Sequence, residues 1–485
     1  MTGTSLNHST SRLAGIYKKF ADAQKATKAK VSFGFQVVLH TPNHDLSSKD
    51  RILLRELIIN RNYVSSIGDY MEAQIAIPLG TFLYRVYDNM DNMEVTLRVR
   101  KQFQSGSPTK PVTVVTRYKA VYLVDKNSQI PNNRVMTEND LNDRLPVVIT
   151  LQLIDRTVEA LRVKTIPGGS FGNVRIPVDK FMASIISREA SNVLIDGLPC
   201  LDMITTQPAT VQSPMGYLTL PSFSRLIEMP DYLQEKSVGV YSSGLGCYIQ
   251  KAGLSYTSYK RGLWTYSLYD PDRTTDNAVK CVIYCSDEGY TAGSYPGVIF
   301  DNTLLTVLGQ GASGVDDDKE AAMMSEGTGF RVGNAAKLMT SEAFKVTKKG
   351  PVFERAKMTT EVLHKKRRDG VNFAPQVGNY SNHLALGSAV LARQAVYMTL
   401  SVMNVDHDLI LPGKLTKIIV HGTKVASDSS GRVASVKASI TRLGILHEML
   451  VRYSGINNNP IMDLNSTYSE LTSVAELKYC VGKPT

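Results

Sequence analysis

Alternation of apolar and polar residues is the feature that most limits the folds open to this chain. Between residues 31 and 163, runs rich in Val, Ile, Tyr and Thr are separated by clusters of Pro, Asn, Asp and Gly. The segment EVTLRVR at residues 94–100 shows the pattern, because alternate side chains of a strand point to opposite faces of a sheet. We therefore predict an antiparallel β-barrel or sandwich, with strands at residues 31–40, 73–88, 93–103, 112–125 and 145–154.

The middle of the chain mixes helical and strand patterns. Pro177 opens a segment at residues 178–194 in which apolar residues recur at helical spacing. A second helix-like pattern at residues 222–241 is interrupted only at Pro230 and is expected to run into a strand at residues 238–241. Further strands are expected at residues 246–250, 263–269 and 279–286.

The last third begins irregularly and ends in strands. Residues 287–382 carry Gly, Asp and Lys clusters and indicate an extended insertion or a partner-facing region. Residues 385–405 then become strand-like, and residues 415–421 and 432–443 alternate on either side of a turn at residues 427–431. A second β domain is therefore expected to close late in the chain.

These patterns predict a mainly β fold with an α+β middle, in which a mixed α/β region joins two tube-like antiparallel β-barrel domains. The length of 485 residues suits two to four domains. Apolar residues at helical spacing among lysines at residues 1–30 indicate either a packed surface helix or a partner-binding arm. The predicted division is a basic N-terminal arm at 1–30, a first barrel at 31–165, a mixed middle domain that includes second-barrel strands at 166–286, the insertion at 287–382, closing strands of the second barrel at 383–450, and a C-terminal tail at 451–485.

The composition indicates which environment and which kinds of partner suit this chain. The chain is 43% hydrophobic and 20% charged, which is typical of globular proteins. Its 55 basic and 44 acidic residues give a net charge of +11 and favour anionic partners such as nucleic acid, an acidic protein face or lipid headgroups. We expect neither a signal peptide nor a membrane-spanning segment, and synthesis in a cytosol. The scattered cysteines agree with reduced thiols; they are Cys200, Cys247, Cys281, Cys285 and Cys480.

Two glycine-rich segments match catalytic motifs in form only. Residues 309–314 read G-x-G-x-x-G, but Val315 and three aspartates intervene before the next helix-like segment, where a dinucleotide site needs the helix to start within the glycines. Residues 168–172 read G-x-S-x-G, yet the chain that follows Ser170 is extended and ends in proline, unlike the nucleophile elbow of a hydrolase. We interpret the first segment as a surface loop and the second as a glycine linker.

Three other candidate sites are also weak. Pro42 between His40 and His44 prevents the helical turn that would place both imidazoles on one metal. Cys281 and Cys285 lie four residues apart on an expected strand, about 13 Å and too far to share an ion or a disulfide. The basic run at residues 364–368 lacks interleaved aromatic residues for base stacking. We therefore predict no catalytic, cofactor-binding or metal-binding residue, and a protein that is not an enzyme.

The order of elements resembles a known family. A β domain is followed by the helix of residues 177–194, then by Tyr232-Leu233 and the segment Gly239-Val240-Tyr241, and then by further strands. The late segment LPGKL at residues 411–415, continuing to residue 443, is similar to the closing barrel of the same family. Over about two thirds of its length the chain thus resembles the central baseplate hub protein of contractile-tailed bacteriophages, which is related to the base of type VI secretion spikes. Residues 1–30 and 287–382 and the positive net charge depart from that pattern.

The resemblance implies a structural role in a virion. It implies a homotrimer whose two similar β domains per chain form a pseudo-sixfold ring, which adapts a sixfold tail tube to a threefold central spike. Expected partners are the central spike protein, tail tube or tube-adaptor proteins and baseplate wedge proteins, with non-specific passage of DNA through the channel. The expected location is the tail baseplate of the virion, after synthesis in the bacterial host cytoplasm. Two alternatives stay open: a tube-initiating or wedge component, and a basic nucleic-acid-binding protein.

Overall fold

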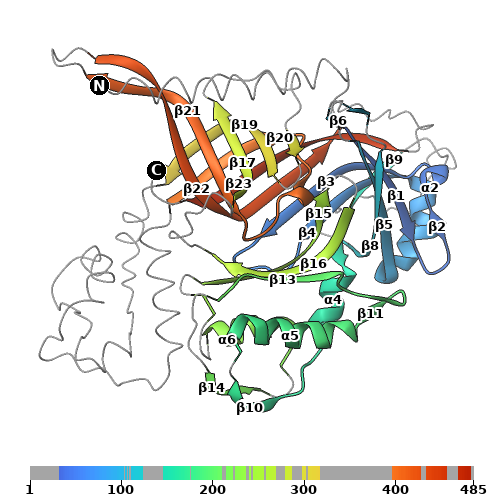
Figure 1. The fold of residues 1–485 in the computed structure, drawn as a ribbon. Helices are drawn as coiled ribbons and strands as arrows, with labels where there is room; N and C mark the ends of the chain where they lie inside the picture. The colour runs from blue at the N-terminus through green and yellow to red at the C-terminus, as the bar shows by residue number, and fades with distance from the viewer. Residues whose placement is uncertain are drawn as a thin grey trace, which may run out of the picture.

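The computed structural model describes most of the predicted β regions. The residues described are 32–102, 104–105, 107–108, 111–123, 146–174, 176–209, 215–221, 224–235, 240–241, 244–255, 258–268, 279–286, 298–301, 304–316, 396–427, 433–455 and 468–481. The expected arm at residues 1–30 and the basic run at residues 364–368 lie outside them. Within them the protein is mainly β, as predicted (Figure 1).

Eight strands are hydrogen-bonded in a closed cycle, which we call the first strand circuit. Its order is β22–β3–β4–β9–β8–β5–β1–β23, and β23 pairs again with β22. All of these pairings are antiparallel. The strands are β1 (Ser32–His40), β3 (Leu53–Asn62), β4 (Tyr70–Pro78), β5 (Met93–Gln102), β8 (Val112–Tyr122), β9 (Pro146–Asp155), β22 (Val433–Ser454) and β23 (Ser469–Val481).

A second strand circuit shares β22 and β23 with the first. Its order is β22–β21–β17–β19–β20–β23, and β17 pairs in parallel with both β19 and β21. Residues 433–444 of β22 pair with β21, whereas residues 448–454 pair with β3. The four added strands are β17 (Val279–Ser286), β19 (Leu304–Asp316), β20 (Val396–Met403) and β21 (Leu415–Ser427). A further strand, β18 (Val298–Asp301), pairs with residues 304–307 of β19.

A mixed α/β layer packs against the first strand circuit. Strands β13 (Met203–Thr206), β16 (Ser258–Ser267) and β15 (Leu245–Ser255) form a three-stranded sheet, and α5 (Val178–Ser191) lies beneath it in Figure 1. One face of β15 and β16 joins the large core of the two circuits, whereas the other joins a second core. The remaining elements of this layer are α4 (Arg156–Val163), α6 (Met229–Glu235), the pair β10 (Gly169–Val174) and β14 (Met215–Leu220), and the hairpin β11 (Leu194–Ile195) and β12 (Leu198–Pro199).

Several predicted elements are confirmed. Strands expected at residues 31–40, 93–103, 112–125 and 145–154 correspond to β1, β5, β8 and β9, and the expected helix at residues 178–194 is α5. The late alternating segment is longer than expected, since β22 continues to Ser454. Residues 469–481, which lie in the segment expected as a tail, form β23. The predicted domain boundaries themselves stay a prediction.

The strand expected at residues 73–88 is wrong in its second half. β4 ends at Pro78, and helical turns follow as α2 (Leu79–Thr81), η2 (Phe82–Val86) and η3 (Tyr87–Asn92). Leu79, Phe82 and Val86 are buried and lie three and four residues apart, so this stretch buries one face at the helical period. The aromatic and β-branched residues of this half concealed that change of period; they are Thr81, Phe82, Tyr84, Val86 and Tyr87.

The expected junction at residues 222–241 is only half right. A 3₁₀ turn, η5 (Leu226–Glu228), leads into α6, and Pro230 is tolerated because it lies in the first turn. Val240 and Tyr241, however, belong to no strand. The amide oxygen of the buried Gln234 accepts from both of their backbone N–H groups, each at 2.9 Å, so a side chain takes the place of a neighbouring strand.

Both glycine-rich segments differ from expectation because they form strands. Residues 309–314 lie inside β19, which is paired with β20 and irregular between Gly309 and Gly311, so the expected surface loop is wrong. Residues 169–172 belong to β10, where Ser170 pairs with Thr219, so the expected linker is also wrong. Within the described residues, no helix combines the length and apolarity needed to cross a membrane.

Candidate functional site

The loop at residues 404–413, between β20 and β21, places three polar residues inside the protein. Asn404 adopts a left-handed conformation, with φ of 54°, and its N–H donates to the carbonyl of Ser473 at 2.8 Å. Asp406 then caps the short turn η8 (His407–Leu409) by accepting from the N–H of Asp408 at 3.1 Å. This turn carries Asp406, His407 and Asp408 against the inner ends of β3 and β5. Together with Arg61, Asp69 and Lys101 they form what we call the charge cluster.

Lys101 is the first cation of the charge cluster. It is the last inward residue of β5, and 2% of its surface is exposed. Its Nζ donates to Asp406 at 2.8 Å and to Asp408 at 2.7 Å, and lies 4.2 Å from the centre of the Tyr259 ring. Burial opposes the charge, but the carboxylates of Asp406 and Asp408 outweigh it and raise the pKa of Lys101. Lys101 is therefore a fully charged, fully paired lysine.

Arg61 of β3 is the second cation. Its guanidinium holds Asp69 through two nitrogens, at 3.0 and 2.9 Å, in a bidentate arrangement. It also donates to Asp408 at 3.0 Å and to the carbonyl of His407 at 3.2 Å. Although burial works against ionisation of Asp408, its neighbours His407, Lys101 and Arg61 hold the pKa of this carboxyl well below its usual range. The two cations are thus joined through Asp408.

The donor set of the loop does not suit a metal ion. Asp406, His407 and Asp408 offer ligand atoms within 4.8 Å of one another. Both carboxylates already accept from Lys101, however, and His407 Nδ1 lies 2.6 Å from the Tyr453 hydroxyl. A divalent ion at this point would face the charges of Lys101 and Arg61 at short range. The arrangement is that of a buried ion-pair network.

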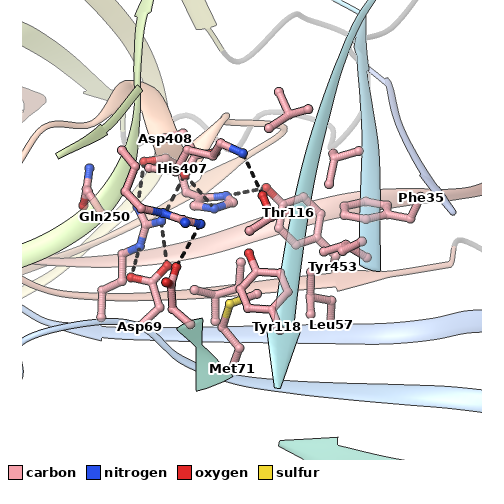
Figure 2. Close-up of a pocket in the computed structure, with 18 of the residues that line it drawn as sticks. Phe35, Leu57, Asp69, Met71, Thr116, Tyr118, Gln250, His407, Asp408 and Tyr453 are labelled. Carbon is pink, nitrogen blue, oxygen red and sulfur yellow. Dashed lines mark hydrogen bonds and ion pairs between the residues drawn. The ribbon is translucent and has the colours of Figure 1, made fainter. Parts of the chain in front are cut away.

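A cavity of about 40 Å³ adjoins the charge cluster (Figure 2). His407, Asp408, Thr116, Tyr118 and Tyr453, all labelled in Figure 2, line this cavity. The wall also includes Lys251 of β15 and Arg261 of β16, so the mixed α/β layer covers this end of the first strand circuit. Polar groups from both parts of the protein therefore line one cavity.

The charge cluster joins segments that are distant in the sequence. Lys101 and Asp406 are 305 residues apart, and the Tyr259 hydroxyl donates to Asp406 at 2.8 Å. A buried ion pair adds little net stability over an apolar core, but removal of one partner leaves an uncompensated charge and costs about 3–5 kcal/mol. The network thus links the loop to the first strand circuit and to β16.

The candidate sites considered in the sequence lie elsewhere. His40 contacts Asp45 at 2.6 Å through Nδ1 and Thr96 at 2.8 Å through Nε2. Cys281 and Cys285 both lie on β17 as buried free thiols, and burial raises the pKa of each to about 12. Ser170 lies on β10. None of these residues lines the cavity.

The charge cluster was not predicted from the sequence, although part of its signal was present. Leu97, Val99 and Lys101 follow the inward alternation of β5, as Leu57, Ile59 and Arg61 do on β3. A cation at the end of an inward-facing series predicts a buried partner. The identity of that partner could not be read, because it lies in a loop several hundred residues away.

Comparisons with known proteins find no matching family model and no matching curated protein. Among solved structures, the 43 kDa tail protein of prophage MuSo2 from Shewanella oneidensis aligns with a TM-score of 0.37 and 10% identity, covering 91% of this chain and 98% of that one. A chain of the lidless PdpA–VgrG complex aligns with a TM-score of 0.32 and 10% identity. That alignment covers 93% of this chain and 65% of the other, so the present chain spans less than two thirds of that chain's length.

Proposed function

We propose that this protein is a structural component of a phage tail baseplate, and specifically its central hub. The observation that carries the proposal is the pair of strand circuits joined through β22 and β23. We interpret these circuits as the two tube-like barrels that the sequence resemblance implies. A single chain then supplies two β units in a fixed relative position.

Such a chain suits a symmetry adaptor. Three copies in a ring present six β units to a sixfold tail tube, while the ring as a whole keeps the threefold symmetry of a central spike. The mixed α/β layer and the loops would meet the spike and wedge proteins, and DNA would pass through the channel without sequence-specific contact. The role requires no cofactor and no chemical turnover.

The charge cluster supports this role through rigidity. A hub transmits load between the tube and the spike, so its two β units need one fixed arrangement. Lys101 and Arg61 form ion pairs with the loop at residues 404–413, at the place where the second strand circuit meets the first. Its ion pairs are buried, so bulk salt screens them far less than surface pairs.

The test is the symmetry of the purified full-length chain. Native mass spectrometry is expected to give three times the chain mass of 53.4 kDa, and electron-microscopy class averages are expected to show a ring with six peripheral densities. A monomer that joins sixfold rings only with other tail proteins would replace the hub with a tube-initiating or wedge component. Binding of DNA that weakens steeply with salt, without ring formation, would instead support a nucleic-acid-binding protein.

A further inference from the structure

Strands β21 and β22 form a hairpin that runs past the strands beside them. The pairing of β17 with β21 ends at His421, and the pairing of β23 with β22 begins at Gly444. Beyond those points β21 and β22 stay paired with each other through residues 422–427 and 433–440, which we call the hairpin arm. Figure 1 shows this end of the hairpin, in orange, projecting from the second strand circuit.

Each strand of the hairpin arm has one edge without a neighbouring strand in the described part of the chain. β17 does not extend beside residues 422–427, and neither β23 nor β3 extends beside residues 433–440. Such an edge carries a row of backbone N–H and C=O groups that can pair with another chain. The arm contains no proline, which would block an edge. Because a two-stranded hairpin is marginally stable by itself, the arm suits the addition of a further strand.

The core-facing side of this hairpin ends on an exposed apolar residue at the base of the arm. Val420 and Ile440 are direct partners in the register, so their side chains share one face of the sheet. Ile418 lies on the same face and is fully buried, and Val420 packs against the large core. Ile440, in contrast, is 47% exposed. An apolar side chain next to two free strand edges is therefore available to a neighbouring molecule.

A second copy of the arm matches both free edges. The two strands of a hairpin run in opposite directions, so two arms that lie side by side and point the same way bring β22 of one copy beside β21 of the next. That contact is an antiparallel pair, like the pair within each arm. It covers one edge in each copy and leaves the other edge for a further copy. The contact joins different surfaces of two copies, as a ring requires.

We propose that the hairpin arm binds a second copy of this chain by strand addition, in which β22 of one arm pairs with β21 of the next and Ile440 is buried in the contact. The inference deepens the proposed hub role and rests on it, because it assigns the contact between neighbouring copies to one hairpin. Most of the binding comes from the backbone, and Ile440 adds an apolar contact.

Hydrogen exchange of the full-length protein measures this backbone pairing directly. Amides on an unpaired edge exchange quickly, whereas amides bonded to a second copy are protected. Peptides that cover residues 433–440 are expected to exchange slowly at high protein concentration and faster after dilution. Peptides from β4, which has a neighbour on both sides, should be unaffected by concentration. Rapid exchange of the arm in the assembled protein would overturn the inference.

A shortened arm separates this inference from the hub role. Replacing residues 423–437 by Asn-Gly joins the direct partners Gly422 and Ala438 through a two-residue turn. Native mass spectrometry is expected to give a trimer for the full-length chain and a monomer for this variant, with the fold checked by circular dichroism. A trimer in both would contradict the arm contact and leave the hub. A full-length dimer that the shortened arm abolishes would contradict the hub and support the arm contact.

A point variant serves if the shortened chain does not fold. Ile440→Ser removes the exposed apolar side chain and is expected to raise the dissociation constant between copies about tenfold. The matched control is Leu198→Ser, at a position 69% exposed in the hairpin of β11 and β12, which should leave self-association unchanged. Equal affinities for wild type and Ile440→Ser would contradict the contact.

Discussion

Lys101 is the residue on which the charge cluster depends most. Among the described residues, Lys101 is the only charged side chain of the first strand circuit that pairs with the Asp406 carboxylate. Lys101→Met would leave Asp406 buried with Tyr259 and a backbone N–H as its remaining donors. We expect the free energy of unfolding to fall by about 3–5 kcal/mol. Urea denaturation followed by fluorescence measures it, because the single tryptophan, Trp264, is 2% exposed.

Lys119→Met is the matched control for this prediction. Lys119 also pairs with a carboxylate, Glu159 at 2.8 Å, but both side chains are more than 40% exposed. Exposed pairs contribute about 0–1 kcal/mol. If the free energy of unfolding fell equally in the two variants, burial of the charge cluster would have no effect on stability.

The pH dependence of stability tests the environment of Lys251. Burial lowers the pKa of this ammonium to about 8, Arg261 and Lys101 act in the same direction, and Asp408 and Asp155 oppose them. The ordinary value is 10.5, so between these two values the unfolded chain binds more protons than the folded one. The contribution of Lys251 to the free energy of unfolding therefore rises with pH in this window and is constant below it.

The measurement compares wild type with Lys251→Met in gluconate buffer. Denaturation at about pH 7.5 and about pH 9.5 should show wild type gaining stability relative to the variant as the pH rises. Buried thiols and tyrosines titrate in both proteins, so their effects cancel in the difference. A difference between the two proteins that does not change with pH would mean that Lys251 keeps its ordinary pKa.

At the scale of elements, Gly413 marks a close approach between the loop at residues 404–413 and β16. Its φ is +64°, and a Cβ at this position would collide with the Cβ and Cγ atoms of Tyr266. Gly413→Ala therefore combines left-handed strain with overpacking against a buried ring. We expect a loss of about 2–5 kcal/mol in the free energy of unfolding.

Gly197 provides a control that separates the two effects. Its φ is +81°, but a Cβ there would meet no atom within 4 Å. Gly197→Ala should cost about 1–2 kcal/mol from backbone strain alone. Both losses are read from urea denaturation curves of the full-length variants. If Gly197→Ala cost as much as Gly413→Ala, the packing of the loop on Tyr266 would be ruled out as a cause.

An element could be predicted from the sequence when the residues that determine it lie within the element itself. β5 and α5 carry their period in their own residues, and both were predicted within a few positions. β19 contains three glycines and three polar residues within its last eight positions, and it is a strand because β17 and β20 pair with it on either side. Neighbours of that kind override local preference, and one sequence does not reveal them.

The same limit applies to the whole molecule. Alternation predicted that β strands form early and late in the chain, but not that β22 serves both groups. β22 changes its partner from β21 to β3 near Ile445, and β23 makes the matching change from β20 to β1. Those pairings depend on contacts between residues that are several hundred positions apart. No local sequence pattern therefore indicated that the two circuits share β22 and β23.

Sharing β22 and β23 has a consequence for how the molecule unfolds. Neither strand circuit can open without removing two strands from the other, and one continuous core runs through both circuits and includes Trp264. We therefore expect a single cooperative transition for the described parts of the chain. Ile75→Ala in β4 and Ile283→Ala in β17 alter fully buried residues that belong to different circuits. Each should lower the stability of the whole by about 2–5 kcal/mol.

The two substitutions should shift the transitions of Trp264 fluorescence and of far-ultraviolet circular dichroism together. Val163→Ala, at a position 77% exposed, serves as the control and should leave both midpoints within about 0.5 kcal/mol of wild type. If Ile283→Ala produced an early step visible only in circular dichroism, the second strand circuit would unfold by itself. The shared strands would then hold the circuits side by side without coupling them, and a ring built from such chains would be flexible at that joint.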